Sequence, residues 1–322
     1  MKYPALCVAA ALALALPAAA VQAQSKYPTK PIRLLTPFAA GGGSDLLARL
    51  IGPPLTEVFG QAIVVDNRPG GGGTLGAGIA AHAAPDGYTM IVVSGSYGAN
   101  AALHKLDYDT VTGITPVILI GTTPLVITLH PTVPVKTIPE LIAYSKANPQ
   151  KLNIASAGIG GLDHLAGELF KLATGVTYTM VPYKGSGPAM TALLSGEVSG
   201  GLTTLVTAIP HVKTGRLRAA GVTTAKRSRA LPDVQAIAES VPGFEVVHWY
   251  GLWGPKGLPR DIVTLWNREV ARVLKNEKVA RWLEDQGLEP AGGPPEEYAN
   301  RLRIDVDKWK RVVKEAKIVA SG

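Results

Sequence analysis

Two glycine-rich segments carry the residues whose types and spacing could bind a ligand. PFAAGGGSD occupies residues 37–45, and NIASAGIGGLDH occupies residues 153–164. Each follows a short apolar run typical of a strand and precedes a helical pattern, so each sets backbone N–H groups at a helix N-terminus. Because the helix dipole is positive there and glycine lets the backbone approach a ligand, we expect the two loops to face each other around an anion.

Polar side chains in these segments add to the anion-binding chemistry. Ser44 can cap the first helix, and Asp45 lies beside it in the opening turn, where we expect it to be occupied. His164, in the second helix, is either a ligand-binding group or a histidine that packs at the helix start.

Other chemistry that uses glycine and serine has weaker support. GGGTLG, residues 71–76, fits the dinucleotide pattern G-x-G-x-x-G, but no acidic residue follows about 20 positions later. SGSYG (94–98) and IASAG (154–158) each lack the first glycine of the hydrolase motif G-x-S-x-G. An exported serine hydrolase that uses Ser94 or Ser156, with a histidine brought near by folding, stays open as the alternative.

The histidines and the cysteine give no support for a metal or a cofactor. The chain has 6 histidines, and none is paired as H-x-H or H-x-x-x-H. The single cysteine, Cys7, lies inside the N-terminal apolar run. We therefore predict no metal site, no cofactor and no disulfide.

The N-terminus has the pattern of a secretory signal peptide. Lys2 precedes an apolar run from Ala5 to Leu16, which Pro17 ends, and small residues follow up to Ala23. We predict cleavage after Ala23 and a periplasmic mature protein. Cys7 precedes the position of a lipoprotein cysteine, so we expect no membrane anchor.

Composition and length fit a globular protein of two lobes. The chain has 322 residues, of which 47% are hydrophobic and 17% charged. The formal net charge is +8, but lysine and arginine are scattered. Export argues against nucleic acid as a partner, so the charge indicates a solvated basic surface and at most anionic partners.

The pattern along the chain positions the two loops in two α/β units. Strand and helix patterns alternate from Pro31 to Ser94, and a second alternating series begins near Leu125. ITPVILIGTTPLVITL, residues 114–129, has internal proline and glycine and reads as two strands. Helices alone follow residue 255. We predict a signal peptide over 1–23, one lobe over 24–124 plus 250–322, a second over 125–249, and crossovers near Pro124 and Trp249.

Several motifs, in order, resemble the periplasmic solute receptors of the tripartite tricarboxylate transporter system, also called Bug receptors. The matching stretches include YPTKPIRLLTPFAAGGGSDLLAR, VVDNRPGGGGTLGA, LNIASAGIGGLDHLAGELFK, VPYKGSGPAM and WYGLWGPKGLP. The resemblance implies a two-lobed periplasmic-binding-protein fold (the type II Venus flytrap) that closes on small carboxylates. It implies a ligand carboxylate held by backbone groups and bridging waters in Phe38–Asp45 and Ser156–Gly161, with Pro182–Gly185 alongside.

The resemblance and the loop chemistry together predict a binding protein that performs no catalysis. We expect a monomer that binds a small carboxylate and delivers it to integral-membrane transporter subunits, or that serves as an extracytoplasmic sensor. The Trp249, Tyr250 and Trp253 cluster is either core or a cleft wall. The predicted ligand-binding residues are Phe38, Ala39, Ala40, Gly41, Gly42, Ser44, Asp45, Ser94, Asn100, Ser156, Ala157, Gly158, Gly160, His164, Tyr183, Lys184, Thr203 and Trp249.

One departure from the family's motifs bears on the ligand. Where members of the family often have Phe-Asp-Asn, this chain has Leu202-Thr203-Thr204. A threonine hydroxyl is neutral and cannot neutralise a buried ammonium group as aspartate can. We therefore expect a non-amino organic acid, aliphatic or aromatic.

The first testable consequence concerns the N-terminus. We expect N-terminal sequencing of the exported protein to begin near Gln24, because the motif ending at Ala23 fits signal-peptide cleavage. An intact Met1 or a lipidated Cys7 would contradict this prediction.

Overall fold

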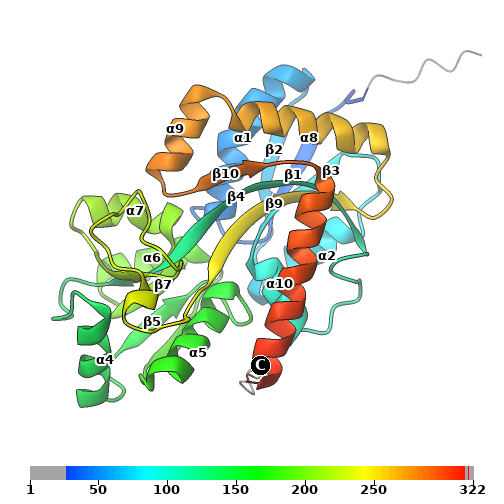
Figure 1. Ribbon diagram of the computed structural model, residues 1–322. Helices are drawn as coiled ribbons and strands as arrows, with labels where there is room; N and C mark the ends of the chain where they lie inside the picture. Colours follow the sequence, from blue (N-terminus) through cyan, green and yellow to red (C-terminus); the bar gives the residue numbers. More distant parts are fainter. Residues whose placement is uncertain (1–26, 316–317, 319–322) are drawn as a thin grey trace, which may run out of the picture.

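The computed structural model describes residues 27–315 and residue 318 (Figure 1). The predicted signal peptide and its cleavage point lie outside the described residues. Within the described part, we find no helix with both the length and the apolar character needed to span a bilayer.

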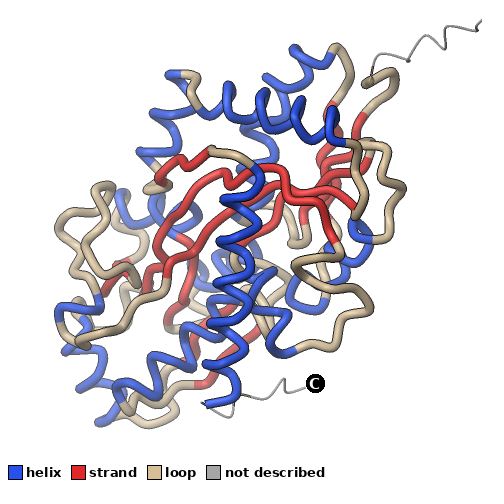
Figure 2. The backbone as a smooth tube through the Cα atoms, turned by 45° about the vertical axis from the view of Figure 1, so that its right-hand side comes forward, coloured by secondary structure: helices blue, strands red, loops and turns tan. Residues whose placement is uncertain are grey.

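Ten strands of the described chain are joined by hydrogen bonds in the order β2-β1-β3-β9-β4-β7-β5-β6, with β10 and β8 also paired to β4. Their bounds are β1 Ile32–Thr36, β2 Ile63–Asn67, β3 Thr89–Ser94, β4 Ile114–Leu129, β5 Asn153–Ser156, β6 Thr179–Pro182, β7 Gly200–Thr204, β8 Arg218–Val222, β9 Val247–Pro255 and β10 Glu289–Gly292. β1 runs parallel to β2 and β3, and β5 runs parallel to β6 and β7. The strands thus form two parallel groups that meet at β4 and β9. Figure 2 shows the strands in red, with blue helices around them.

The helices of the described chain fill the connections between these strands. Their bounds are α1 Gly43–Phe59, α2 Thr74–Ala81, α3 Ser96–Leu103, α4 Ile138–Ala147, α5 Leu162–Thr174, α6 Ser186–Ser195, α7 Leu205–Lys213, α8 Arg260–Leu274, α9 Glu277–Asp285 and α10 Pro295–Glu315, with short 3-10 turns at Gly71–Gly73 and Ile237–Glu239.

Apolar periodicity explains why α1 and α5 form. In α1, Leu47, Ile51 and Leu55 recur every four residues and are fully buried. In α5, Leu162, Leu165, Ala166 and Phe170 form the equivalent buried stripe. Each helix ends at a glycine with positive φ, 65° at Gly60 and 70° at Gly175, which a residue with a side chain adopts less readily.

Helices cover both faces of each strand group. α1, α8 and α9 pack on one face of the first group, and α2 and α10 pack on the other. α4 and α5 cover one face of the second group, while α6 and α7 cover the opposite face. The predicted two-lobed α/β fold is confirmed.

β4 and β9 connect the two groups as neighbouring antiparallel strands. They pair from Ile114 opposite Pro255 to Pro124 opposite Val247, and β4 then continues into pairs with β7 and β8. The expectation of two strands over residues 114–129 was wrong, because this segment is one strand of 16 residues. Register shifts next to Pro116 and Gly121 let the pairing continue past the residues that interrupt the sequence pattern.

The C-terminal helix contacts both groups. Tyr298 and Leu302 of α10 pack in the first group, whereas Trp309, two turns later, belongs to the cluster that contains Leu165 and Phe170. The expectation that only helices follow VVHWYGLWG was wrong, because β10 pairs with β4 in the first group. The division into lobes at residues 124 and 250 stays a prediction.

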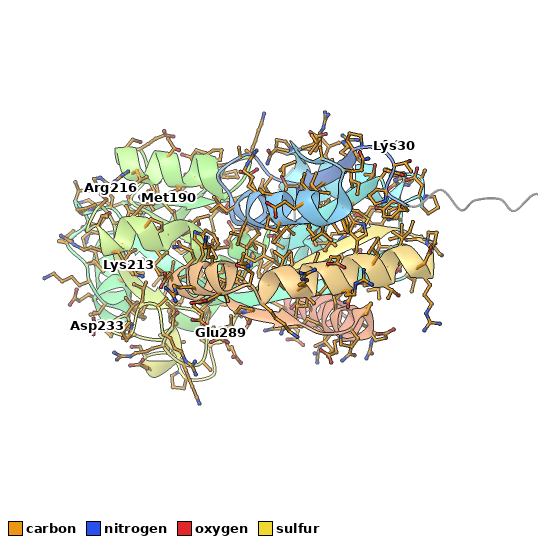
Figure 3. All side chains as sticks on the ribbon, turned by 90° about the horizontal axis from the view of Figure 1, so that it is seen from above. Lys30, Met190, Lys213, Arg216, Asp233 and Glu289 are labelled. Carbon is orange, nitrogen blue, oxygen red and sulfur yellow. The ribbon has the colours of Figure 1, made fainter. Side chains whose placement is uncertain are left out.

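The carboxyl ends of β1, β3, β5 and β7 lead into loops or helices at the junction of the two groups. In contrast, the labelled charged residues Lys30, Lys213, Arg216, Asp233 and Glu289 are exposed on the outside of the molecule (Figure 3). The polar residues at the junction, such as Ser94 at the end of β3 and Thr204 at the end of β7, are instead buried.

Candidate functional site

A cavity lies at the junction of the two groups of strands. Both groups of strands contribute to its wall. The lining residues are Phe38, Gly42, Gly43, Ser44, Ser94, Ser96, Leu125, Ala157, Asp163, Ser186, Thr203, Thr204, His248 and Tyr250.

Five helices begin at this cavity. α1 contributes Gly43 and Ser44, α3 contributes Ser96, and α6 contributes Ser186 from its first position. α5 contributes Asp163, and Thr204 is the N-cap of α7. The first-turn N–H groups of a helix have no acceptor within the helix, and their dipoles favour negative charge. The cavity therefore has the electrostatics of an anion site.

The cavity wall has no lysine or arginine among its described residues. His248 does not supply a positive charge either, because burial, assisted by the nearby Arg301, lowers the pKa of its imidazole to about 3. The described residues also contain no group of three or more acidic, histidine or cysteine side chains that could hold a metal ion. An anion in this cavity would be stabilised by N–H and hydroxyl dipoles.

Hydrogen bonds hold the two sides of the cavity together. The Ala39 N–H donates to the carbonyl of Lys184 over 3.1 Å. At the start of α5, the Leu162 N–H donates to Ser96 Oγ, on the other side, over 3.0 Å. The lobes are therefore in contact around the cavity, as in a closed binding protein.

The first loop is braced by Asp45, which does not line the cavity. Its carboxylate accepts hydrogen bonds from the Gly41 N–H (2.9 Å), Arg49 Nε (3.0 Å) and Asn67 Nδ2 (3.0 Å). Burial acts to raise the pKa of Asp45, but these partners outweigh it and hold the pKa below its usual value. The expectation that Asp45 is occupied is confirmed, and it leaves Gly43 and Ser44 facing the cavity.

The second loop is braced differently, by a carboxylate that does line the cavity. The Asp163 carboxylate accepts a hydrogen bond from the Ala157 N–H, and the nearby N–H groups of Asp163 and His164 also act to lower its pKa. Burial nevertheless raises the pKa of Asp163 to about 6. The Gly160 N–H donates to His164 Nδ1 over 3.2 Å. The protein thus uses most N–H groups of this loop itself, so the two loops are not equivalent anion donors as the sequence pattern suggested.

Gly43 is required by the close approach of Tyr250. A Cβ atom at Gly43 would lie 1.8 Å from Tyr250 Oη and 2.6 Å from Cζ. The Tyr250 ring in turn lies 4.8 Å from the His248 ring, centroid to centroid. The start of α1 therefore rests directly on a tyrosine of β9.

Four polar atoms of the lining residues are buried without a hydrogen-bond partner in the described structure. They are Ser44 Oγ, Thr203 Oγ1, His248 Nδ1 and Tyr250 Oη. Leaving such a group unpaired costs about 1–3 kcal/mol, so their concentration in one cavity indicates a site that a polar ligand completes.

The structure brings six of the predicted site residues to the cavity wall: Phe38, Gly42, Ser44, Ser94, Ala157 and Thr203. Others lie in the supporting loops, namely Ala39, Ala40, Gly41, Asp45, Ser156, Gly158, Gly160 and His164. Asn100 supports the glycine-rich turn at residues 71–73, because its side-chain amide donates to the carbonyl of Gly72 over 2.8 Å.

The three remaining predicted residues, Trp249, Tyr183 and Lys184, also do not line the cavity. Trp249 is fully buried, its Nε1 donates to Asp305 over 3.0 Å, and its ring packs on Tyr298, so it is core and not a cleft wall. Tyr183 directs its hydroxyl to Glu197 at the surface (2.7 Å), and Lys184 is exposed. Lys184 reaches the first loop only through its backbone carbonyl.

Sequence reasoning missed Ser96, Leu125, Asp163, Ser186, Thr204 and His248 as lining residues, whereas Gly43 lies within the predicted range Phe38–Asp45 and Tyr250 within the aromatic cluster left open as a cleft wall. A signal for His248 and Tyr250 was present in VVHWYGLWG. Side chains of a strand alternate between faces, which puts His248 and Tyr250 on one face and Trp249 and Trp253 on the other. The structure has this arrangement.

The geometry does not assemble a hydrolase site. No hydrogen bond joins Ser94 or Ser156 to a histidine among the described residues. His248, the histidine in the cavity wall, has a pKa of about 3 and would be a weak general base at neutral pH.

The sequence of this chain is similar to that of known solute receptors. The sequence model of a protein family, described as the tripartite tricarboxylate transporter family receptor, matches residues 47–318 of this chain. Protein BugT of Bordetella pertussis is 34% identical over 293 residues, which are 90% of this chain and 90% of BugT.

Solved structures are similar over nearly the whole chain. Rpa4515 of R. palustris, described with adipate, is 37% identical, with a TM-score of 0.87 over 91% of this chain and 99% of the other. MatC from Rhodopseudomonas palustris, described with bound malate, is 34% identical, with a TM-score of 0.85 over 89% of this chain and 100% of MatC.

Adjacent glycines in the first loop give a matched test of the cavity's packing. We expect Gly43→Ala to lower the free energy of unfolding by about 1–3 kcal/mol, because the new methyl group must displace Tyr250. Gly42→Ala should change it by less than about 0.5 kcal/mol, since its Cβ would lie 3.5 Å from the Ala39 carbonyl oxygen, an ordinary contact distance, and its φ is −81°. Urea denaturation measures both, and equal losses would contradict the packing described here.

The buried Asp163 should make stability depend on pH. Its pKa of about 6 lies above the unfolded value of about 3.9, so the folded state holds more protons between these values and loses stability as pH rises. We expect Asp163→Asn, relative to wild type, to gain up to about 3 kcal/mol between pH 3.5 and pH 8. Urea denaturation at both pH values gives this difference, with Asp233→Asn as the surface control. A difference that does not change with pH would rule out the buried ionisation.

Proposed function

The chain belongs to the tripartite tricarboxylate transporter receptor family, and we propose that it captures a small non-amino organic acid for delivery to the membrane subunits of such a transporter. It would act in the periplasm as a monomer that begins near Gln24, and it would perform no catalysis on its ligand.

The cavity's anion-favouring wall carries this proposal. Five helix starts and several hydroxyl groups surround a space without a cationic side chain. Such dipoles stabilise a carboxylate without forming a salt bridge that would have to be broken on release. The similar proteins described with adipate and malate hold carboxylates, which supports the same class of ligand here.

The absence of a free carboxylate for an ammonium group supports a non-amino acid. Thr203, the residue that replaces an expected aspartate, does line the cavity and is neutral. Asp45 has three partners outside the cavity, and Asp163 accepts a hydrogen bond from the Ala157 N–H. An amino acid would have to bury its ammonium group without a dedicated counter-ion, which is costly.

Calorimetry with matched acids tests the proposal. We expect succinate, glutarate or adipate to bind, and the amino analogues aspartate and glutamate to bind at least about tenfold more weakly than their parent acids, because an ammonium group lacks a partner. A bound acid at 100 times its Kd should also stabilise the protein by about 2.7 kcal/mol in a thermal unfolding assay.

Two outcomes would contradict this account in different ways. Tighter binding of the amino acid in both pairs would overturn the ligand class while leaving the receptor. Turnover of generic ester or amide substrates that Ser94→Ala or Ser156→Ala abolishes would overturn the receptor and favour a hydrolase.

A further inference from the structure

Three neutral polar residues, Thr203, His248 and Tyr250, form one part of the cavity wall, which we call the cavity floor. An ionised carboxylate on the ligand does not satisfy all of their hydrogen-bonding groups. His248 and Tyr250 lie on one face of β9, and Thr203 lies on β7. β4 is the neighbour of both strands, with Thr123 opposite His248 and Val126 opposite Thr203. All three side chains are at most 3% exposed, and each has a polar atom without a protein partner.

These polar atoms are best satisfied by a ligand group that can both donate and accept hydrogen bonds. The hydroxyl groups of Thr203 and Tyr250 can play either role, whereas His248 Nδ1 donates or accepts according to the tautomer of the neutral ring. An ionised carboxylate can only accept, so it satisfies His248 Nδ1 in one tautomer alone. A ligand hydroxyl group satisfies it in both.

Charge excludes the other common substituents from this floor. An ammonium group would need a carboxylate, and the floor residues provide none. Among Thr203, His248 and Tyr250 a second carboxylate would find neither a cation nor a helix start, because burial keeps His248 uncharged with a pKa of about 3 and all three residues lie on strands. The N–H groups of Gly43 and Ser44, at the start of α1, are the better place for a carboxylate.

We propose that Thr203 and His248, with Tyr250 beside them, form a subsite for a hydroxyl group on the ligand, so that the protein selects hydroxy acids over the same acids without the hydroxyl. The inference rests on the proposed function as an organic-acid receptor. It names Thr203 and His248 as residues that determine specificity. A site built around a hydroxyl group rejects an analogue that lacks it, because its own buried polar groups are then left unpaired.

The test is calorimetry with pairs of acids that differ only in a hydroxyl group. The pairs are propionate and lactate, succinate and malate, glutarate and 2-hydroxyglutarate, and benzoate and 4-hydroxybenzoate, with both enantiomers where they exist. We expect the hydroxy acid to bind at least about tenfold more tightly in the pair that fits the cavity, which corresponds to about 1.4 kcal/mol.

Variants then assign the preference to the subsite. Thr203→Val removes the hydroxyl at nearly constant volume, and His248→Phe removes both ring nitrogens. Each should reduce the preference to less than about threefold, mainly by weakening the hydroxy acid. Thr214→Val is the matched control, because its hydroxyl lies at the exposed end of α7 and donates to the carbonyl of Pro210 over 2.8 Å.

The outcomes separate this inference from the proposed function. If acids bind with equal affinity in every pair, or if the preference survives in a folded Thr203→Val variant and a folded His248→Phe variant, the hydroxyl subsite is wrong and the receptor stands. Thermal unfolding shows which variants are folded, and Thr203→Val alone suffices if His248→Phe is not. If no acid of any pair binds, both proposals are overturned.

Discussion

The constraint on which this structure depends is the stabilisation of a buried anion without a buried cation. A carboxylate taken out of water loses its hydration, and an oriented set of N–H and hydroxyl groups must replace it. Helix starts can do this only where several of them converge. The convergence at the junction requires strands whose carboxyl ends point there, which the two parallel groups provide. β4 and β9 then hold the two groups side by side.

The two glycine loops meet this constraint in different ways. In the first, Asp45 is turned away from the cavity and secured by Arg49 and Asn67, which leaves the start of α1 to face the ligand space. In the second, Asp163 accepts a hydrogen bond from the Ala157 N–H and remains part of the wall. The Leu162 N–H, at the start of α5, donates a hydrogen bond to Ser96 Oγ on the opposite side of the cavity. This part of the helix start therefore holds the two sides together and is not free to bind a ligand. The cavity is therefore asymmetric although the sequence motifs look alike.

The sequence predicts the fold class and the two loops well, because both depend on local patterns. The buried stripe of α1, with Leu47, Ile51 and Leu55, can be read from its spacing, and so can the glycines that end the helices. The residues of the cavity floor could not be read in this way, since they depend on which strands lie side by side. His248 and Thr203 line the same cavity only because β9 and β7 both pair with β4. Trp249 could be a cleft wall or core on sequence grounds, and the Asp305 contact that makes it core lies 56 residues away.

The central claim is that the ligand's carboxylate lies against helix N-termini and hydroxyl groups and forms no salt bridge. A crystal structure of the protein with the organic acid that binds most tightly in calorimetry tests it most directly. The account predicts carboxylate oxygens within hydrogen-bond distance of the Gly43 and Ser44 N–H groups, with Asp163 still bonded to Ala157. A carboxylate paired with Lys184, or with any other lysine or arginine side chain, would contradict it.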